Sequence, residues 1–290
     1  MIDLLLQSLC SGLLAAGTYA LVALGLALVF GAMRIINLTH GELVLLAAYI
    51  AYTFEAKLGI NPVFAIPAAI PVVCAAAAVS YGLISRIRQD RELNSLILTY
   101  GLGLMITNAV LLIWHGDVRS SGNAWLQDSI TFGPLFSMRS EVLSFVISIT
   151  LMIALWWWLS RSWYGRAVRA VSSNRDAAKL MGINPRKIEL ASFLVAGLLA
   201  SVAGVAIYSS GSIQPAVGEA LTIKAFVITV LAGVGSIPGV LVGAMLLGLT
   251  ESLTMTFGSS SLQQLAGMVL FLLVLYVLPN GLFGAVRRRG

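Results

Sequence analysis

Apolar runs about as long as a bilayer is thick follow one another along almost the whole of this 290-residue chain. A helix rises about 1.5 Å per residue, so roughly 20 predominantly apolar residues cross the hydrocarbon core. The runs occupy residues 4–33, 41–54, 62–85, 93–114, 141–160, 188–210, 220–236, 238–256 and 262–279. Only 10% of the residues are charged, whereas soluble proteins carry roughly a quarter. The sequence therefore predicts an all-α, polytopic transmembrane helix bundle with about eight or nine membrane segments.

Basic residues cluster at three places beside these runs. The clusters are Arg86, Arg88 and Arg91, the loop 161–189, and Arg287 to Arg289. Lys and Arg accumulate in cytosolic loops of membrane proteins. Placing the three clusters inside makes 115–140 the main external loop and puts the N-terminus outside. The net charge of +6 is therefore a topology signal, because the basic clusters lack the base-reading or stacking groups of a nucleic-acid interface.

The loop 161–189 holds a short segment with the signals of a capped helix. Ser173 is placed to accept a hydrogen bond from the backbone N–H of Asp176, which can answer as the acid of a capping box. Gly182 supplies the left-handed residue that ends a helix. The whole loop carries seven basic residues against Asp176 and Glu189.

The two faces of this helix differ. Ala177, Leu180 and Met181 share one face, and Arg175 and Lys179 share another. A compact cytosolic helix with an apolar and a basic face is suited to bind a soluble partner. We therefore predict a docking segment formed by Ser173, Arg175, Asp176, Ala177, Ala178, Lys179, Leu180, Met181 and Gly182. The alternative is a loop held inside by its charge, with a helix that touches only lipid headgroups.

Two helices are predicted to be interrupted, near residues 34–42 and 232–239. The first break contains Asn37-Leu-Thr-His-Gly-Glu42, and the second contains Gly233-Val-Gly-Ser-Ile-Pro-Gly239. Paired interruptions often mark a translocation site, because backbone groups freed at a break must line protein or water. The alternative is an ordinary turn between helices, for which the glycine-rich second string is well suited.

Polar side chains inside apolar runs are costly and are functional candidates by default. The predicted pathway residues are Asn37, His40, Glu42, Gly233, Gly235, Ser236 and Glu251. For Asn37 and His40, capping of freed backbone groups is the alternative to solute contact. Gln214, Glu219 and Lys224 are expected by the second external loop, where they bind a solute-delivery partner or mark the water interface.

Catalytic and metal-binding patterns are missing from the sequence. One His with one Glu makes no metal site, Cys10 and Cys74 show no metal spacing, and no nucleophile–base set recurs. The phosphate-binding pattern G-x-x-x-x-G-K-[S/T] is also missing, so ATP-driven work requires an ATPase on another chain. Residues 1–290 are expected to form one transmembrane domain without a cofactor, with loop 161–189 on the cytosolic side.

The docking segment resembles a known signature. Asp176-Ala-Ala-Lys-Leu-Met-Gly182 is similar to the Glu-Ala-Ala-x-x-x-Gly sequence by which importer-type ABC permeases dock their ATPases. Asp stands where Glu is usual, and Asn184-Pro-Arg186 stands near the place of the later Ile-x-Leu-Pro part.

Further motifs extend the resemblance over nearly the whole chain. They are Ile36-Asn-Leu-Thr-His-Gly-Glu-Leu43, Ala48-Tyr49, Gly165-Arg-Ala167, Met181-Gly-Ile183, Lys224-Ala-Phe226 and Leu231-Ala-Gly-Val-Gly-Ser-Ile-Pro-Gly239. Their order resembles that of the branched-chain amino acid ABC permeases, the LivH/LivM family, and the length and first motif resemble the LivH-type subunit. Ala232 replaces a glycine that is frequent in that family.

The resemblance implies a multi-pass permease of a bacterial plasma (inner) membrane. It implies three kinds of partner: a second, LivM-like permease subunit, two cytosolic ABC ATPases and an external solute-binding protein. Transport would follow alternating access, with branched-chain or related amino acids as solutes. Permeases for urea, short amides or other small solutes are the alternative within the family. A self-sufficient, proton-coupled secondary transporter is the alternative outside it, because His40 and Glu42 could couple to protons.

Overall fold

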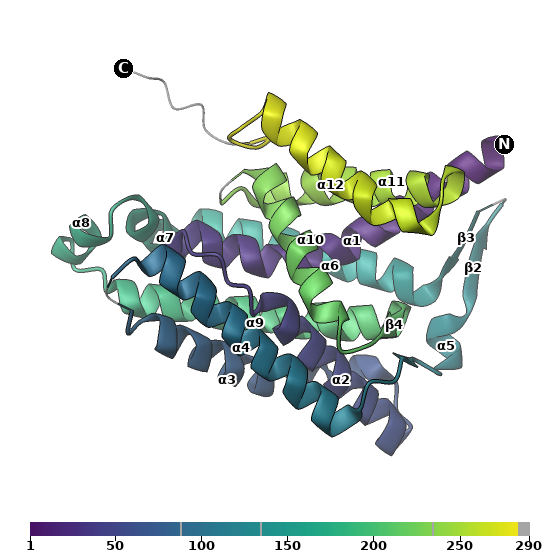
Figure 1. Ribbon diagram of the computed structural model, residues 1–290, viewed down its shortest axis with the longest axis horizontal. Helices are drawn as coiled ribbons and strands as arrows, with labels where there is room; N and C mark the ends of the chain where they lie inside the picture. The colour runs from purple at the N-terminus through teal and green to yellow at the C-terminus, as the bar shows by residue number, and fades with distance from the viewer. Residues whose placement is uncertain (88, 134, 234, 284–290) are drawn as a thin grey trace.

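The computed structural model describes residues 1–87, 89–133, 135–233 and 235–283 and is a helical bundle (Figure 1). Within these residues, seven helices are long and apolar enough to cross a membrane. They are Ile2–Met33 (α1), Ile66–Ile84 (α3, with the preceding 3-10 turn Pro62–Ala65), Arg91–Trp114 (α4), Arg139–Arg161 (α6), Pro185–Ser210 (α9), Ile237–Phe257 (α11) and Ser260–Val277 (α12). With His40–Leu58 (α2) and Val217–Ala232 (α10), they confirm the predicted polytopic helical bundle.

The remaining elements are short and lie at the two ends of the bundle. They are Arg119–Ser120 (β1), Ala124–Gln127 (α5), Ser129–Phe132 (β2), Leu135–Met138 (β3), Trp163–Ser173 (α7), Arg175–Leu180 (α8) and Ser212–Ile213 (β4). β1 pairs antiparallel with β4, and β2 pairs antiparallel with β3. The strands and α5 lie at one end of the molecule, and α7 and α8 lie at the other (Figure 1).

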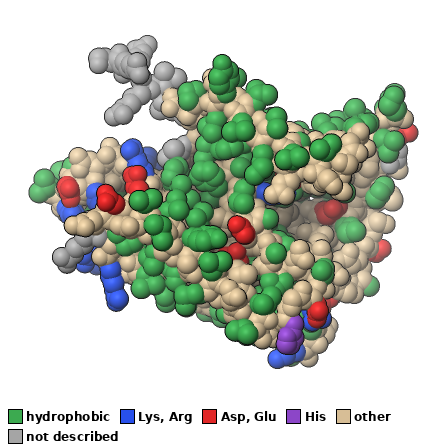
Figure 2. All heavy atoms as spheres, viewed as in Figure 1, with side chains coloured by type: hydrophobic (Ala, Val, Ile, Leu, Met, Phe, Trp, Pro, Cys, Tyr) green, Lys and Arg blue, Asp and Glu red, His purple; other side chains and the backbone are tan. Residues whose placement is uncertain are grey.

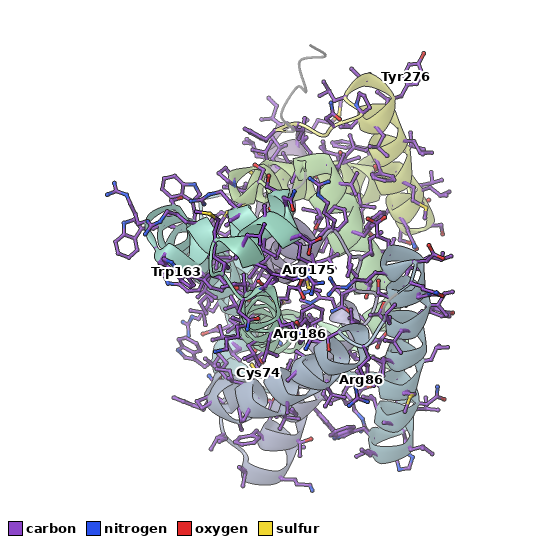
Figure 3. The ribbon with its side chains drawn as sticks, turned by 90° about the vertical axis from the view of Figure 1, so that its left-hand side faces the viewer. Cys74, Arg86, Trp163, Arg175, Arg186 and Tyr276 are labelled. Carbon is purple, nitrogen blue, oxygen red and sulfur yellow. The ribbon has the colours of Figure 1, made fainter. Side chains whose placement is uncertain are left out.

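The basic clusters gather at the end that carries α7 and α8. Figure 3 looks onto this end and shows Arg86, Arg175 and Arg186 together on it. Figure 2 shows hydrophobic side chains over the middle of the molecule. This distribution agrees with the predicted orientation, in which 86–92 and 161–189 lie on one side and 115–140 on the other. Arg88 and Arg287 to Arg289 lie outside the described residues.

The N-terminus lies at the end opposite the basic clusters. The Gln7 side-chain amide donates to the Phe136 carbonyl oxygen over 2.8 Å, which places the start of α1 beside the β2–β3 hairpin. α1 then runs through the bundle to the basic end (Figure 1). An external N-terminus, as predicted, follows once the basic end is taken as cytosolic.

Small residues bring α1, α9 and their neighbours close together. Gly12 of α1 faces Gly248 of α11, and a methyl group added at Gly12 would lie 2.9 Å from the Gly248 carbonyl oxygen. Gly204 of α9 likewise lies against the backbone of α2 at Val44. Close backbone packing replaces the hydrophobic effect as the source of stability between helices in lipid.

The first predicted interruption is a helix that restarts inside the bundle. α1 ends at Met33, Arg34 adopts a left-handed conformation (φ 56°), and α2 begins at His40. The ring Nε2 of His40 donates to the Val22 carbonyl oxygen over 2.9 Å. His40 also lies beside Gly25, which itself faces Ala196 in the middle of α9. The start of α2 is therefore buried about halfway along the bundle.

The second predicted interruption has a different geometry. α10 ends at Ala232 and α11 begins at Ile237, and the helices pack as antiparallel neighbours joined by an ion pair between Lys224 and Glu251. Gly233 and Gly235 take the positive φ angles, 87° and 77°, that this tight connection requires. α10 and α11 are thus joined by an interhelical turn, the alternative that the glycine content of this part of the sequence suggests.

Candidate functional site

The predicted docking segment is a separate short helix, α8. Its N-cap is Asn174, whose Oδ1 accepts from the backbone N–H groups of Asp176 (3.1 Å) and Ala177 (2.9 Å). The prediction that Ser173 caps this helix is wrong, because Ser173 is the last residue of α7. Asn174 has the extended backbone that an N-cap needs and stands one residue nearer to the helix.

The Asp176 side chain also differs from the predicted capping box. Its carboxylate accepts a hydrogen bond from Lys179 Nζ over 2.8 Å. This hydrogen bond and the charge of the Lys179 ammonium hold the pKa of the Asp176 carboxyl below its ordinary value. Asp176 therefore stays ionised beside the positive end of the helix dipole.

The C-terminal end of α8 agrees with the sequence. Gly182 has φ 80°, and its N–H donates to the Lys179 carbonyl oxygen over 3.0 Å. The N–H of Ile183 donates to the Ala178 carbonyl oxygen over 3.0 Å. This left-handed turn lets the chain reverse into α9, which is capped by Asn184 and opened by Pro185.

The exposed surface of α8 carries large apolar side chains beside the exposed Asp176–Lys179 ion pair. Leu180 is 89% exposed and Met181 is 82% exposed, and Ala177 lies beside them on the outer face. Ala178 points the other way and packs in a buried cluster with Val168 and Ile188. α8 therefore turns a small side chain towards the bundle and presents its large apolar groups outwards.

Arg175 does not share a free basic face with Lys179. Its guanidinium donates to both carboxylate oxygens of Glu189, over 2.9 and 3.2 Å. Lys179 pairs with Asp176 instead. The predicted common basic face is wrong, because Glu189 draws Arg175 back towards α9.

Glu189 is the centre of a polar network at the basic end. Its carboxylate, 1% exposed, also accepts from Arg91 Nη2 over 3.0 Å and from the Tyr81 hydroxyl over 3.0 Å. The network joins α8 to α3, α4 and α9. Sequence reasoning noted Glu189 only as one of two acids in the loop 161–189, although its place among seven basic residues is a signal for ion pairing.

The polar residues of the first break are buried at the start of α2. The Asn37 side chain accepts from the Thr39 N–H over 3.2 Å, and His40 bonds the α1 backbone as described above. Asn37 therefore satisfies a backbone group at the break, whereas His40 ties the start of α2 to the middle of α1. Glu42, 5% exposed, lies against Gly103 of α4 and Gly218 of α10, and its Oε2 has no hydrogen-bond partner within the described part of the chain.

Glu251 belongs to a second group of polar side chains. Its Oε2 accepts from Lys224 Nζ and from the Tyr19 hydroxyl, each over 2.7 Å, and from the Gln263 amide over 3.2 Å. Lys224 thus lies inside the bundle and not at the external boundary where the sequence placed it. Glu219 lies in the first turn of α10 and is exposed. Gln214, next to β4, is exposed.

One cavity lies beside α10, and a second lies where α1, α6 and α7 meet the connection between α10 and α11. The outer one, about 210 Å³, is lined by Lys224 and Glu251, and the inner one, about 740 Å³, is lined by Gly235 and Ser236. Gly233, which follows the last residue of α10, is buried. The predicted pathway residues therefore fall into three groups and do not form a single site.

Metal binding finds no support among the residues that the structure describes. No group of three His, Cys, Asp or Glu side chains there could hold a metal ion, and Cys10 and Cys74 are free thiols.

Comparison with known proteins identifies the family to which this chain belongs. The family described as "Branched-chain amino acid transport system / permease component" matches residues 8–278. The chain belongs to this permease family. It is 32% identical to the high-affinity branched-chain amino acid transport system permease protein BraD of Pseudomonas aeruginosa, over 96% of this chain and 95% of the relative. The identity to the corresponding permease LivH of Escherichia coli is 31%, over the same shares of the two chains.

A solved structure shows the same fold. One chain of PsaBC from Streptococcus pneumoniae, solved in complex with a Fab, superimposes with a TM-score of 0.53, covering 97% of each chain at 13% identity. The protein is thus a multi-pass inner-membrane permease subunit of an importer, which confirms the predicted class and localisation.

Proposed function

We propose that this permease imports branched-chain amino acids as one membrane subunit of an ATP-driven transporter. The observation that carries the substrate class is the similarity over 96% of the chain to permeases named for branched-chain amino acid transport. Urea, short amides and other small solutes are the competing substrates within the family.

The importer is completed by separate chains. A second, LivM-like permease subunit, two cytosolic ATPases and an external solute-binding protein supply the second half of the pathway, the energy and the solute. The sequence lacks a phosphate-binding loop, so ATP hydrolysis belongs to the ATPases and this chain is the transport subunit. Residues 1–290 act as one transmembrane permease domain.

The ATPases dock on the segment from Ser173 to Gly182. Its exposed Leu180 and Met181 are supported by a short, capped helix, which suits insertion into an apolar groove of a partner. Closure of the ATPases then pushes on α8, and the ion pairs of Glu189 with Arg175 and Arg91 pass the movement to α9 and α4. Alternating access results when these helices shift relative to α1.

The pathway runs from the cavity beside α10 to the cavity at the connection between α10 and α11. Glu251 faces its outer cavity, and Gly235 and Ser236 face its inner cavity. Asn37 and His40 fix the buried start of α2, and Glu42 is held between α2, α4 and α10.

Uptake by the reconstituted importer tests the proposal. Proteoliposomes with this permease, its partner subunit, the ATPases and the binding protein should take up L-leucine when ATP is supplied on the ATPase side. Uptake of urea or propionamide without uptake of L-leucine, L-isoleucine or L-valine would contradict the substrate class.

A proton-coupled transporter is the second candidate, favoured by the buried Oε2 of Glu42, which finds no hydrogen-bond partner among the described residues. Proteoliposomes that hold this chain alone distinguish it: solute uptake driven by a proton gradient without ATP would support this candidate, and no uptake is expected on the importer proposal.

A further inference from the structure

The outer cavity combines opposite charges with apolar walls. It lies between α10, α11 and α12 and has a volume of about 210 Å³. Lys224 and Glu251 supply one cation and one anion, and Gln263 supplies an amide. The apolar part of the wall includes Ile223, Val227, Leu247 and Met268.

This cavity lies in the outer half of the bundle. Ser252, next to Glu251, donates to the carbonyl oxygen of Ser8 near the external start of α1, over 2.7 Å. A solute delivered from outside the cell therefore meets the cavity before it reaches the basic end.

The two charges are held in place from several helices. Lys224 Nζ lies 2.7 Å from Glu251 Oε2 and also donates to the Tyr19 hydroxyl over 2.7 Å, with its ammonium 4.2 Å from the centre of the Tyr19 ring. The Glu251 side chain is 4% exposed, whereas that of Lys224 is 27% exposed, and both residues line the cavity. The pair is thus fixed, with the lysine as its more accessible member.

Stability alone does not account for such a pair. Replacing a buried ion pair with apolar side chains of similar size is often neutral or stabilising, and ionisable groups at membrane depth usually mark solute or ion pathways. Both charges here face one cavity. The pair therefore offers two complementary contacts to a ligand that carries both signs.

We propose that this cavity is a transit site for the zwitterionic head of an amino acid with an apolar side chain. The inference rests on the proposed function and names the groups that recognise the solute. The solute carboxylate contacts the Lys224 ammonium, the solute ammonium contacts the Glu251 carboxylate, and the aliphatic side chain lies against Ile223, Val227 and Leu247. The solute exchanges partners with the existing pair, so charges remain balanced and no proton moves.

α10 also leads from this site to the inner cavity. Ala220, Ile223, Lys224 and Val227 form one stripe at helical spacing along the outer cavity, and Val230, three residues further, lines the inner cavity. Arg34 and Arg169 lie on the wall of the inner cavity and give it a positive charge. A carboxylate that leaves Lys224 thus moves towards further basic groups at the cytosolic end.

The test uses the complete importer in proteoliposomes, with radiolabelled L-leucine on the binding-protein side. The double variant Lys224→Met/Glu251→Gln removes both charges together, so no buried charge is left unpaired. We expect it to keep its ATPase content and basal ATP hydrolysis but to lose about tenfold or more of L-leucine uptake, because a hydrogen bond to a charged group is worth about 1.5–3 kcal/mol and about 1.4 kcal/mol is a factor of ten.

Two further variants complete the test. Ser252→Ala removes a hydrogen bond between the same helices, α11 and α1, but does not line the cavity, so it should keep wild-type uptake. Ala220→Leu narrows the cavity without touching either charge and should lower L-leucine uptake even if the double variant fails to assemble.

The outcomes separate the inference from the proposed function. Wild-type uptake by the assembled double variant, or by Ala220→Leu, would overturn the transit site while leaving the substrate class intact. A wild-type importer that takes up urea but no branched-chain amino acid would overturn the substrate class itself.

Discussion

Removal of the Glu189 charge should loosen α8 from the bundle. Glu189→Gln keeps the size of the side chain but leaves the guanidinium groups of Arg91 and Arg175 without their anion. Loss of one partner of a fully buried pair costs about 3–5 kcal/mol, whereas exposed pairs contribute about 0–1 kcal/mol. The Arg91 side chain is 22% exposed and the Arg175 side chain is 38% exposed. The contribution of each ion pair therefore lies between the values for buried and exposed pairs, and that of the Arg175 pair lies near the exposed value.

Glu189→Gln should therefore lower the free energy of unfolding by about 2–3 kcal/mol, with most of the loss from the Arg91–Glu189 ion pair. Denaturant titration in mixed micelles measures this quantity, and hydrogen exchange of the α8 amides reports the local loosening. Lys179→Ala is the control, because it breaks only the exposed pair with Asp176 and should change the free energy by less than about 0.5 kcal/mol. A Glu189→Gln variant with wild-type stability and unchanged α8 exchange would refute the role of this network.

Three further predictions follow from local geometry. Gly204→Ala should cost about 1–3 kcal/mol in mixed-micelle unfolding because its methyl group would overlap the α2 backbone, whereas Gly101→Ala, with nothing within 4 Å, should be neutral or slightly stabilising. Replacing Leu180 and Met181 with Ser should leave the free energy of unfolding unchanged, because both side chains are exposed in the free chain. It should reduce ATPase co-purification by about tenfold or more, since each of these side chains contributes about 1.5–3 kcal/mol when the ATPase buries it. Asn174→Ala removes the cap of α8 and should speed hydrogen exchange of its amides in proportion to a loss of about 1 kcal/mol; unchanged exchange would contradict the cap.

The membrane-spanning architecture could be predicted because each span is a local property of the chain. A run of apolar residues such as 141–160 reaches the length of a bilayer by itself, and α6 forms there. Gly182 was equally predictable, because a left-handed helix end depends on one residue and its immediate neighbours.

The cap of α8 was harder to predict, since Ser173 and Asn174 are both good N-cap residues and adjacent. Which of the two residues caps α8 depends on where α7 ends. The end of α7 is set by the packing of Val168 and Val171 against the bundle. Sequence spacing alone could not distinguish between two helix starts that differ by one position.

The polar networks could not be predicted, because their members are distant in sequence. Glu189 meets Arg91 across 98 positions, and Glu251 meets Tyr19 across 232 positions. Glu251 and Lys224 come together only because α10 and α11 pack as antiparallel neighbours. Helical periodicity places residues three or four apart on one face but is silent about contacts between helices.

The central claim is that the exposed end of α8 faces the cytosol and receives the ATPase. The direct measurement is labelling of Leu180→Cys, in a chain freed of Cys10 and Cys74, with a thiol reagent that does not cross membranes. We expect reaction in inside-out vesicles, protection when the ATPases are bound, and no reaction from outside intact cells. Labelling from outside intact cells, or equal labelling with and without the ATPases, would contradict the account.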